Sequence, residues 1–331
     1  MRFLKSIVKK MLPSKFLLLR ERYIYKRNLK RWNKYWDERA LKYSDISNTK
    51  EAKAALIFAE AHVLQKGITM PNRRLGFGIE KSKSLIKHTN EYIQLYGKDN
   101  DVVRYAISDL KLYLDVHVKE DYDLPNEIVD DILTLSNLIE FVPQKEIIYD
   151  KTDLFKDWQN FKEFAESRHS VRNYSSEPIE ISKIIESVEL AQTAPSACNR
   201  QGVRVKIISS EEMKEKVFSI QNGNRGFGKL ADKILLLTFE QGACEYEYRA
   251  SGYIDVGIFA MNLLYALHVN GICACTLNAH LTISQYEVLQ DLLGYNKSEI
   301  PVLFIAVGYP LSQFKIAKSE RYSTNKIYDV I

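Results

Sequence analysis

The chain has 331 residues, of which 46% are apolar and 27% are charged, with only 14 Gly and 8 Pro. This composition excludes a disordered chain, a collagen-like repeat and a disulfide-rich miniprotein, and the length suits one large or two ordinary domains. Four cysteines in so long a chain do not form a disulfide framework, which favours a reducing, cytoplasmic setting. We expect no signal peptide, and the longest continuous apolar runs are too short to span a bilayer.

The net charge of +5 hides an uneven distribution. Residues 1–43 carry 14 Lys/Arg against 3 Asp/Glu, whereas the whole chain carries 47 against 42, so the remainder is mildly acidic. Residues 1–45 therefore form a basic arm, in which cations are interleaved with aromatic and aliphatic residues. We expect two helical pieces split near Pro13, because proline rarely continues a helix.

Three interpretations of the basic arm stay open. Its aromatic residues could pack on the body of the protein while its charges stay solvated. Alternatively, the arm could contact an anionic membrane surface, which would place a cytoplasmic protein at the inner face of the membrane. Nucleic acid would also suit the charges, but we expect no nucleic-acid partner.

Residues 46–150 are predicted to form a helical accessory region. Apolar residues recur with a helical period in three segments, which end at Gly67, just before Gly97 and near Leu138. In the third segment, we expect the inward-facing residues to be Ile128, Ile132, Leu133, Leu135 and Leu138.

After about residue 150, strands begin to alternate with helices, which indicates an α/β or α+β layer with a central sheet over 151–331. The predicted helices are 182–193, 252–270 and 284–293, and the predicted strands are 203–208, 234–239, 272–277 and 301–307. Gly271 suits the left-handed position that follows a helix.

A first candidate motif consists of Arg168, Ser170 and Arg172, just before the helix over 182–193. Arginine keeps its charge and presents a planar fork of donors, so a local cluster of Arg and Ser suits a phosphate group. From these residues alone, a solvated charged turn is an equally good interpretation.

A second candidate motif consists of Pro195, Ser196, Asn199 and Gln201, in the loop that leads into the strand over 203–208. Ligands commonly dock on loops at sheet ends, and side-chain amides both donate to and accept from a planar heterocycle. Taken alone, an ordinary loop with local side chain to backbone bonds is the favoured interpretation.

In this order and spacing, the two motifs together resemble the signature of the FMN-dependent nitroreductase-like flavoproteins, Arg-x-Ser-x-Arg/Lys, a helix, then Pro-Ser-x-x-Asn-x-Gln. The long helix with Asp255, Gly257 and Asn262 is similar to the dimer helix of that family, and the segment from Gly308 to Arg321 is similar to its C-terminal tail. The resemblance covers about residues 160–331. It implies an α+β fold with a nitroreductase-like central mixed β-sheet flanked by helices, which an all-helical N-terminal region would precede.

The resemblance also implies roles for individual residues. Arg168 and Ser170 would hold the FMN phosphate, with Lys318 or Arg321 on its other side. Arg172 would lie near the flavin N1/O2 edge, where a fixed cation favours the anionic reduced flavin. The remaining implied contacts are His169 on the pyrimidine side, the backbone of Cys275, Thr276 and Leu277 near N5, and Pro195, Ser196, Asn199 and Gln201 around the ring, with Pro195 and Ser196 coming from the partner subunit of a homodimer.

The implied activity is that of an FMN-dependent NAD(P)H oxidoreductase, which passes hydride through flavin N5 to an electron-poor small molecule such as a nitro compound or a quinone, in a ping-pong sequence. Because the cofactor carries the chemistry, we assign no catalytic side chain. One alternative is a nitroreductase-like binding module without turnover in a surface-polysaccharide or membrane-associated assembly. Another is a flavoenzyme of the same fold with other chemistry, such as dehydrogenation or reductive dehalogenation.

A metal site is not expected. Cys273 and Cys275 lie two residues apart, but a single Cys-x-Cys without a second pair or a nearby histidine is poor zinc spacing. We interpret both residues as small buried hydrophobes.

Overall fold

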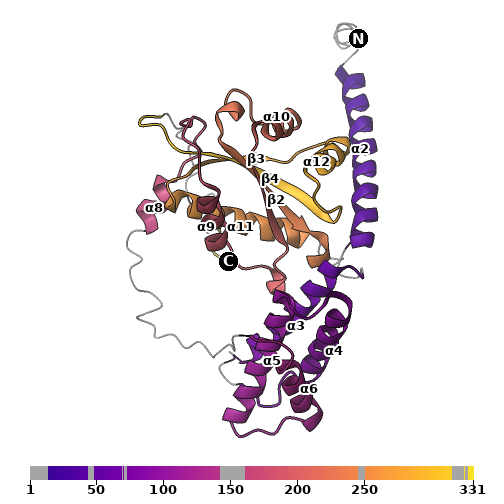
Figure 1. The fold of residues 1–331 in the computed structure, drawn as a ribbon. Coiled ribbons are helices and arrows are strands. Elements are labelled where there is room, and N and C mark those ends of the chain that lie inside the picture. The colour runs from indigo at the N-terminus through magenta and orange to yellow at the C-terminus, as the bar shows by residue number, and fades with distance from the viewer. Residues whose placement is uncertain are drawn as a thin grey trace.

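The computed structural model describes residues 14–43, 48–68, 70, 73–141, 161–244, 250–314, 324 and 327–331. Figure 1 shows a helical region, from α3 to α6, next to an α+β region in which helices cover a sheet, with the long helix α2 alongside. The expected α+β fold and the expected helical N-terminal region are both confirmed. The expected helix break near Pro13 and the expected domain boundaries near residues 45 and 150 lie outside the described residues.

The helical region consists of α3 (Lys50–Ile68), α4 (Ile79–Tyr96), α5 (Asp101–Lys119) and α6 (Asn126–Ser136), which share one apolar core. At the start of α5, the Asn100 side chain accepts a hydrogen bond from the Val103 backbone N–H at 3.1 Å, which satisfies a donor that the helix leaves unpaired. On α6, Ile128, Ile132 and Leu135 are buried. The expectation that Leu133 and Leu138 face inward was wrong. Leu133 lies one residue off this stripe and is 44% exposed, and Leu138, beyond the end of α6, is 37% exposed.

The sheet has the strand order β1-β2-β4-β3, and all its strand pairs are antiparallel. The strands are β1 (Val203–Ile208), β2 (Lys233–Glu240), β3 (Cys273–Asn278) and β4 (Glu299–Gly308). An isolated parallel bridge between Ser170 and Ala274 makes the sheet mixed at its β3 edge. Every residue of the inner strand β2 is buried, because helices cover both faces of the sheet, and this explains the unbroken apolar run of its sequence.

On one face of the sheet lie α9 (Ile181–Ala191) and α11 (Ala250–Val269), and on the other lie α10 (Glu211–Ile220) and α12 (Ile283–Leu293) (Figure 1). We did not predict α10, although the Ser210 side chain caps it by accepting from the Met213 N–H at 3.2 Å. Gly271, with φ of +71°, adopts the left-handed conformation expected after α11.

Helix α11 packs closely on the sheet through Gly252. A Cβ atom at this position would lie 2.4 Å from the Phe239 ring on β2, so any larger residue would push the helix away. In the described part of the chain, α11 is the one helix whose length and composition would allow it to cross a membrane, but its inner side is buried against α9 and the sheet. Ile254, Ile258 and Met261 form an exposed apolar stripe on its outer side.

Helix α2 (Ser14–Tyr43) docks on the α10/α12 face through two tryptophans. Trp32 and Trp36 stack with ring centroids 5.5 Å apart, and both meet the Tyr286 ring of α12 edge-on, at 5.6 and 5.3 Å. The first of the three interpretations of the basic arm therefore holds for these aromatic residues. The N-terminal part of α2 extends past the body (Figure 1).

Candidate functional site

The first motif runs along the free edge of β3. The Val171 N–H donates to the Ala274 carbonyl at 3.1 Å, next to the bridge between Ser170 and Ala274. Farther on, the Tyr174 hydroxyl lies 2.6 Å from the Val171 carbonyl and 3.1 Å from the Ala306 carbonyl of β4. Burial raises the pKa of Tyr174, so this hydroxyl remains a donor. These bonds fix residues 168–174 against the sheet.

Arg172 lies beside Cys275 and the loop before β2. Its guanidinium carbon is 6.0 Å from the centroid of the Phe227 ring, and its charge acts on the Cys275 thiol. Burial nevertheless raises the pKa of Cys275, and Arg172 only partly offsets that effect. Cys275 is thus a neutral buried thiol, whereas the Arg172 side chain is exposed and can meet an anion.

Thr276 presents backbone groups to the same edge. In a strand, peptide groups alternate between the two edges, and the Ala274 peptide faces residues 169–171 rather than β4. The Thr276 peptide therefore faces this edge as well, and none of the described strands pairs with it there. The sheet edge thus offers a backbone donor and acceptor next to Arg172, while Leu277 is buried.

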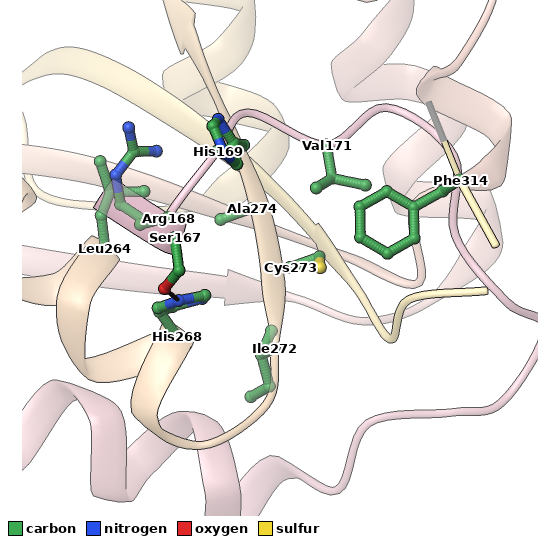
Figure 2. A pocket seen from close by; sticks show the side chains of 10 residues that line it. All are labelled: Ser167, Arg168, His169, Val171, Leu264, His268, Ile272, Cys273, Ala274 and Phe314. Carbon is green, nitrogen blue, oxygen red and sulfur yellow. Dashed lines mark hydrogen bonds between the residues drawn. The ribbon is translucent and has the colours of Figure 1, made fainter. Parts of the chain in front are cut away.

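A cavity of about 300 Å³ opens where the first motif meets the end of α11. Figure 2 shows Ser167 and His268 at one end and Val171 with Phe314 at the other. The Ser167 hydroxyl lies 2.7 Å from His268 Nε2. Burial, and then the nearby Arg168 charge and His169, lower the pKa of His268. The full lining is Ser167, Arg168, His169, Val171, Leu264, His268, Ile272, Cys273, Ala274 and Phe314.

The second motif lies at the opposite edge of the sheet, in the loop before β1. The Ala197 N–H donates to the Asp255 carboxylate of α11 at 3.1 Å, and the Gln201 N–H donates to the Ser196 hydroxyl at 3.0 Å. Pro195, Ser196 and Gln201 line a second cavity of about 300 Å³ beside β1. Asn199 instead turns toward the helical region, where its Nδ2 donates to the Tyr105 hydroxyl at 2.9 Å.

The turn within this loop is strained. Cys198, Asn199 and Gln201 have φ of +50°, +54° and +51°. This left-handed conformation is tolerated by asparagine, but it costs residues such as Cys198 and Gln201 about 1–2 kcal/mol each. Residues that hold such angles against their preference are concentrated at binding and catalytic sites. The strain therefore supports the interpretation of this loop as a site rather than an ordinary connection.

The two motifs do not meet within one chain. Asp255 contacts the second motif, and His268 contacts Ser167, the residue just before the first motif. These two residues are 13 positions apart on α11, or roughly 20 Å at the helical rise of 1.5 Å per residue. The motifs thus form two half-sites at opposite sheet edges, hereafter the Arg half-site (Arg168, Ser170, Arg172, Thr276) and the Asn half-site (Pro195, Ser196, Asn199, Gln201). Lys318 and Arg321 lie outside the described residues.

A comparison with known proteins finds a family match for the stretch that carries both motifs. Residues 165–235 match the sequence model of the nitroreductase family. This stretch of the α+β region is thus similar to the nitroreductase family. The matched stretch contains both motifs together with α9, β1 and α10.

Among curated proteins, the chain is similar to an iodotyrosine deiodinase of Haliscomenobacter hydrossis, with 26% identity over 199 residues, which covers 51% of this chain and 88% of that protein. Among solved structures, it is similar to a nitroreductase family protein of Streptococcus pneumoniae (18% identity, 52% of this chain and 100% of that one, TM-score 0.44). It is also similar to a Desulfovibrio desulfuricans protein described as a nitroreductase and solved in complex with FMN (21% identity, 50% and 94%, TM-score 0.45).

Sequence reasoning missed the residues that surround the half-sites. From the sequence we assign no role to His268, although its place at the end of a helix that leads into the β3 edge is a usable signal. Tyr105 gave no signal, because it belongs to the helical pattern of a region 94 residues away from Asn199. Among the described residues, no group of three or more His, Cys, Asp or Glu side chains is placed to hold a metal ion.

Proposed function

We propose that this protein is an FMN-dependent oxidoreductase that uses NAD(P)H to reduce an electron-poor small molecule such as a nitro compound or a quinone. The observation that carries the proposal is the Arg half-site, where two permanent cations and a serine lie along a sheet edge beside the Thr276 backbone, with which none of the described strands pairs there. The match to the nitroreductase family over this segment supports it, as does the FMN complex of the similar D. desulfuricans protein.

The residues of the Arg half-site fit this cofactor. When bound, FMN supplies the redox chemistry by accepting hydride at N5 and returning the electrons to the acceptor. Arg168 and Ser170 would bind the phosphate, whose two negative charges call for charge-assisted donors. Arg172 would place its fixed cation where reduced flavin gathers negative charge, and the Thr276 backbone would orient the ring. Lys318 or Arg321 would add a further cation.

We also propose that the working unit is a homodimer. A single chain holds its two half-sites at opposite edges of the sheet, so a second copy would have to bring its Asn half-site to the Arg half-site of the first. The exposed stripe of Ile254, Ile258 and Met261 on α11 gives such a pair an apolar surface to bury. In this arrangement Pro195, Ser196, Asn199 and Gln201 would cover the flavin of the partner.

For its location, we propose the cytoplasm, at the inner face of the membrane. The outward side of α2 supports this. Leu19, Tyr23, Lys26, Lys30 and Lys34 are all exposed and are spaced by three or four residues, so they lie on one side of the helix, away from Trp32 and Trp36. Such a row of cations that follows two exposed apolar side chains suits anionic lipid headgroups.

The decisive experiment is a flavin titration followed by anaerobic reduction. We expect the purified protein to bind FMN, and NADH or NADPH to bleach the flavin absorbance. Arg168→Ala should weaken FMN binding about 10- to 100-fold, the loss that follows from one charge-assisted bond. Arg104→Ala, an exposed arginine of α5, serves as the matched control and should bind FMN like the wild type. A protein that binds no added FMN would refute the proposal, whereas flavin binding without reduction would favour a binding module.

A second candidate activity is reductive dehalogenation, which the similarity to an iodotyrosine deiodinase favours. It would use the same cofactor and the same half-sites, with a halogenated aromatic compound in place of the nitro compound or quinone. Release of iodide from an iodotyrosine by the reduced protein, measured beside the turnover of nitro compounds and quinones, distinguishes the two activities.

A further inference from the structure

The helical region touches the Asn half-site directly. Besides the bond from Asn199 Nδ2 to the Tyr105 hydroxyl at 2.9 Å, helix α3 packs against the turn at 197–199. The Phe58 ring of α3 lies 4.7 Å from the Tyr105 ring, with the planes tilted by 52°. A strained turn of the nitroreductase-like region is thus held by side chains from outside that region.

Tyr105 is itself held by a polar chain inside the helical region. Its hydroxyl interacts with the carboxyl of Asp109, one turn farther along α5. Asp109 Oδ1 accepts from Gln65 Nε2 of α3 at 3.0 Å, and Gln65 Oε1 lies 3.2 Å from His62 Nδ1. Asp109 is only 1% exposed. Gln65 and His62 are half-buried. Side chains linked in such a polar chain restrict one another's rotamers.

The bond to Tyr105 fixes the orientation of the Asn199 amide. Its Nδ2 donates to the Tyr105 hydroxyl oxygen at 2.9 Å. The carbonyl oxygen Oδ1 of Asn199 is therefore left as the group to offer to a ligand. That oxygen can accept from an N–H of a heterocycle, but it cannot donate to one.

We propose that Tyr105 is a positioning residue of the flavin site, through which the helical accessory region holds Asn199 with its carbonyl oxygen toward the isoalloxazine ring. This inference rests on the proposed function and extends it to the accessory region. It gives that region a role in flavin binding that needs no contact with the flavin. In a homodimer, the accessory region of each chain would act on the flavin site of its partner.

The test compares two Tyr→Phe variants in the same helix. Tyr105→Phe removes the hydroxyl that holds Asn199, whereas Tyr113→Phe removes the hydroxyl of a fully buried tyrosine eight residues farther along α5, which donates to the Phe77 carbonyl at 2.6 Å. We expect Tyr105→Phe to weaken FMN binding about tenfold, the effect of one lost hydrogen bond, and Tyr113→Phe to leave it unchanged. Equal FMN affinity in wild type and Tyr105→Phe would overturn the proposal.

A double variant separates positioning from general loosening of the fold. In an Asn199→Ala background, Tyr105→Phe should cost no further FMN affinity, because its effect passes through Asn199. A second tenfold loss in that background would show that Tyr105 acts by another route and would overturn the proposal.

Hydrogen exchange in the flavin-free protein tests the role of Tyr105 separately from the proposed function, because it does not depend on flavin binding. Amides of residues 197–201 should exchange about tenfold faster in Tyr105→Phe and at the wild-type rate in Tyr113→Phe. If the wild type binds no FMN, the proposed function fails, whereas an unchanged exchange rate in Tyr105→Phe refutes the hold of Tyr105 on the turn.

Discussion

Asp109 shows how one buried carboxyl can make the stability of the protein depend on pH. Burial raises the pKa of Asp109 from 3.8 to about 7, and the hydrogen bonds from Gln65 and Tyr105 only partly oppose this effect. The folded state therefore holds a proton that the unfolded state has already released between about pH 4 and 7. Over that range, the folded protein loses stability as the pH rises.

We predict that Asp109→Asn removes this dependence. The asparagine side chain carries no charge at any pH. Between pH 5 and 7.5, the free energy of unfolding should therefore drop by about 2 kcal/mol more in the wild type than in the variant. Urea unfolding at several pH values measures the difference. If the two stability curves run parallel, Asp109 does not titrate in this range.

Single residues also show where sequence reasoning stops. Arg168, Ser170 and Arg172 could be selected as a group, because a local cluster of Arg and Ser suits a phosphate and can be recognised without knowledge of the tertiary structure. The bond between Asn199 and Tyr105 could not be predicted, since it joins two regions that each follow their own local pattern. The left-handed conformation at Cys198 could not be predicted either, because cysteine has no preference for it.

At the scale of elements, local patterns placed most helices and strands of the α+β region within about two residues. The strand predicted over 203–208 is β1 itself, and the helix predicted over 182–193 is α9 at Ile181–Ala191. Helix α10 was missed because it is short and carries few apolar residues besides Val217 and Ile220 at its inner side. The order of the strands, and with it the separation of the half-sites, is a tertiary property that periodicity does not encode.

Helix α2 packs on the body of the protein with one side and exposes the other. Its tryptophans dock on α12, and its cations face outward. We predict that the protein co-sediments with vesicles that contain about 30% anionic lipid and not with neutral vesicles, and that salt weakens the binding. The triple change of Lys26, Lys30 and Lys34 to Glu should abolish co-sedimentation.

The matched control for this prediction is the triple change of Lys81, Lys83 and Lys87 to Glu on α4, which alters net charge equally at another exposed surface. This variant should still bind. Equal loss in both variants would mean that net charge alone, rather than the α2 surface, governs binding.

At the scale of the whole molecule, the separation of the half-sites calls for a test with mixed subunits. One chain would carry Arg168→Ala and Arg172→Ala, and the other Ser196→Ala and Asn199→Ala. Each variant alone should bind little FMN. Because random pairing makes half of the dimers mixed, and each mixed dimer has one intact site of two, co-refolded chains should regain about a quarter of the wild-type flavin content. Mixed chains that recover no flavin would place both motifs of a site on one chain.

The position of the two motifs at the ends of α11 has a thermodynamic consequence. If every binding site is shared between two chains, cofactor loading and subunit association are linked equilibria, and each must strengthen the other by the same factor. Dilution would then release flavin from the protein, and a saturating supply of flavin would hold pairs together at chain concentrations where the empty protein dissociates. Bound flavin would thus stabilise the dimer that binds it.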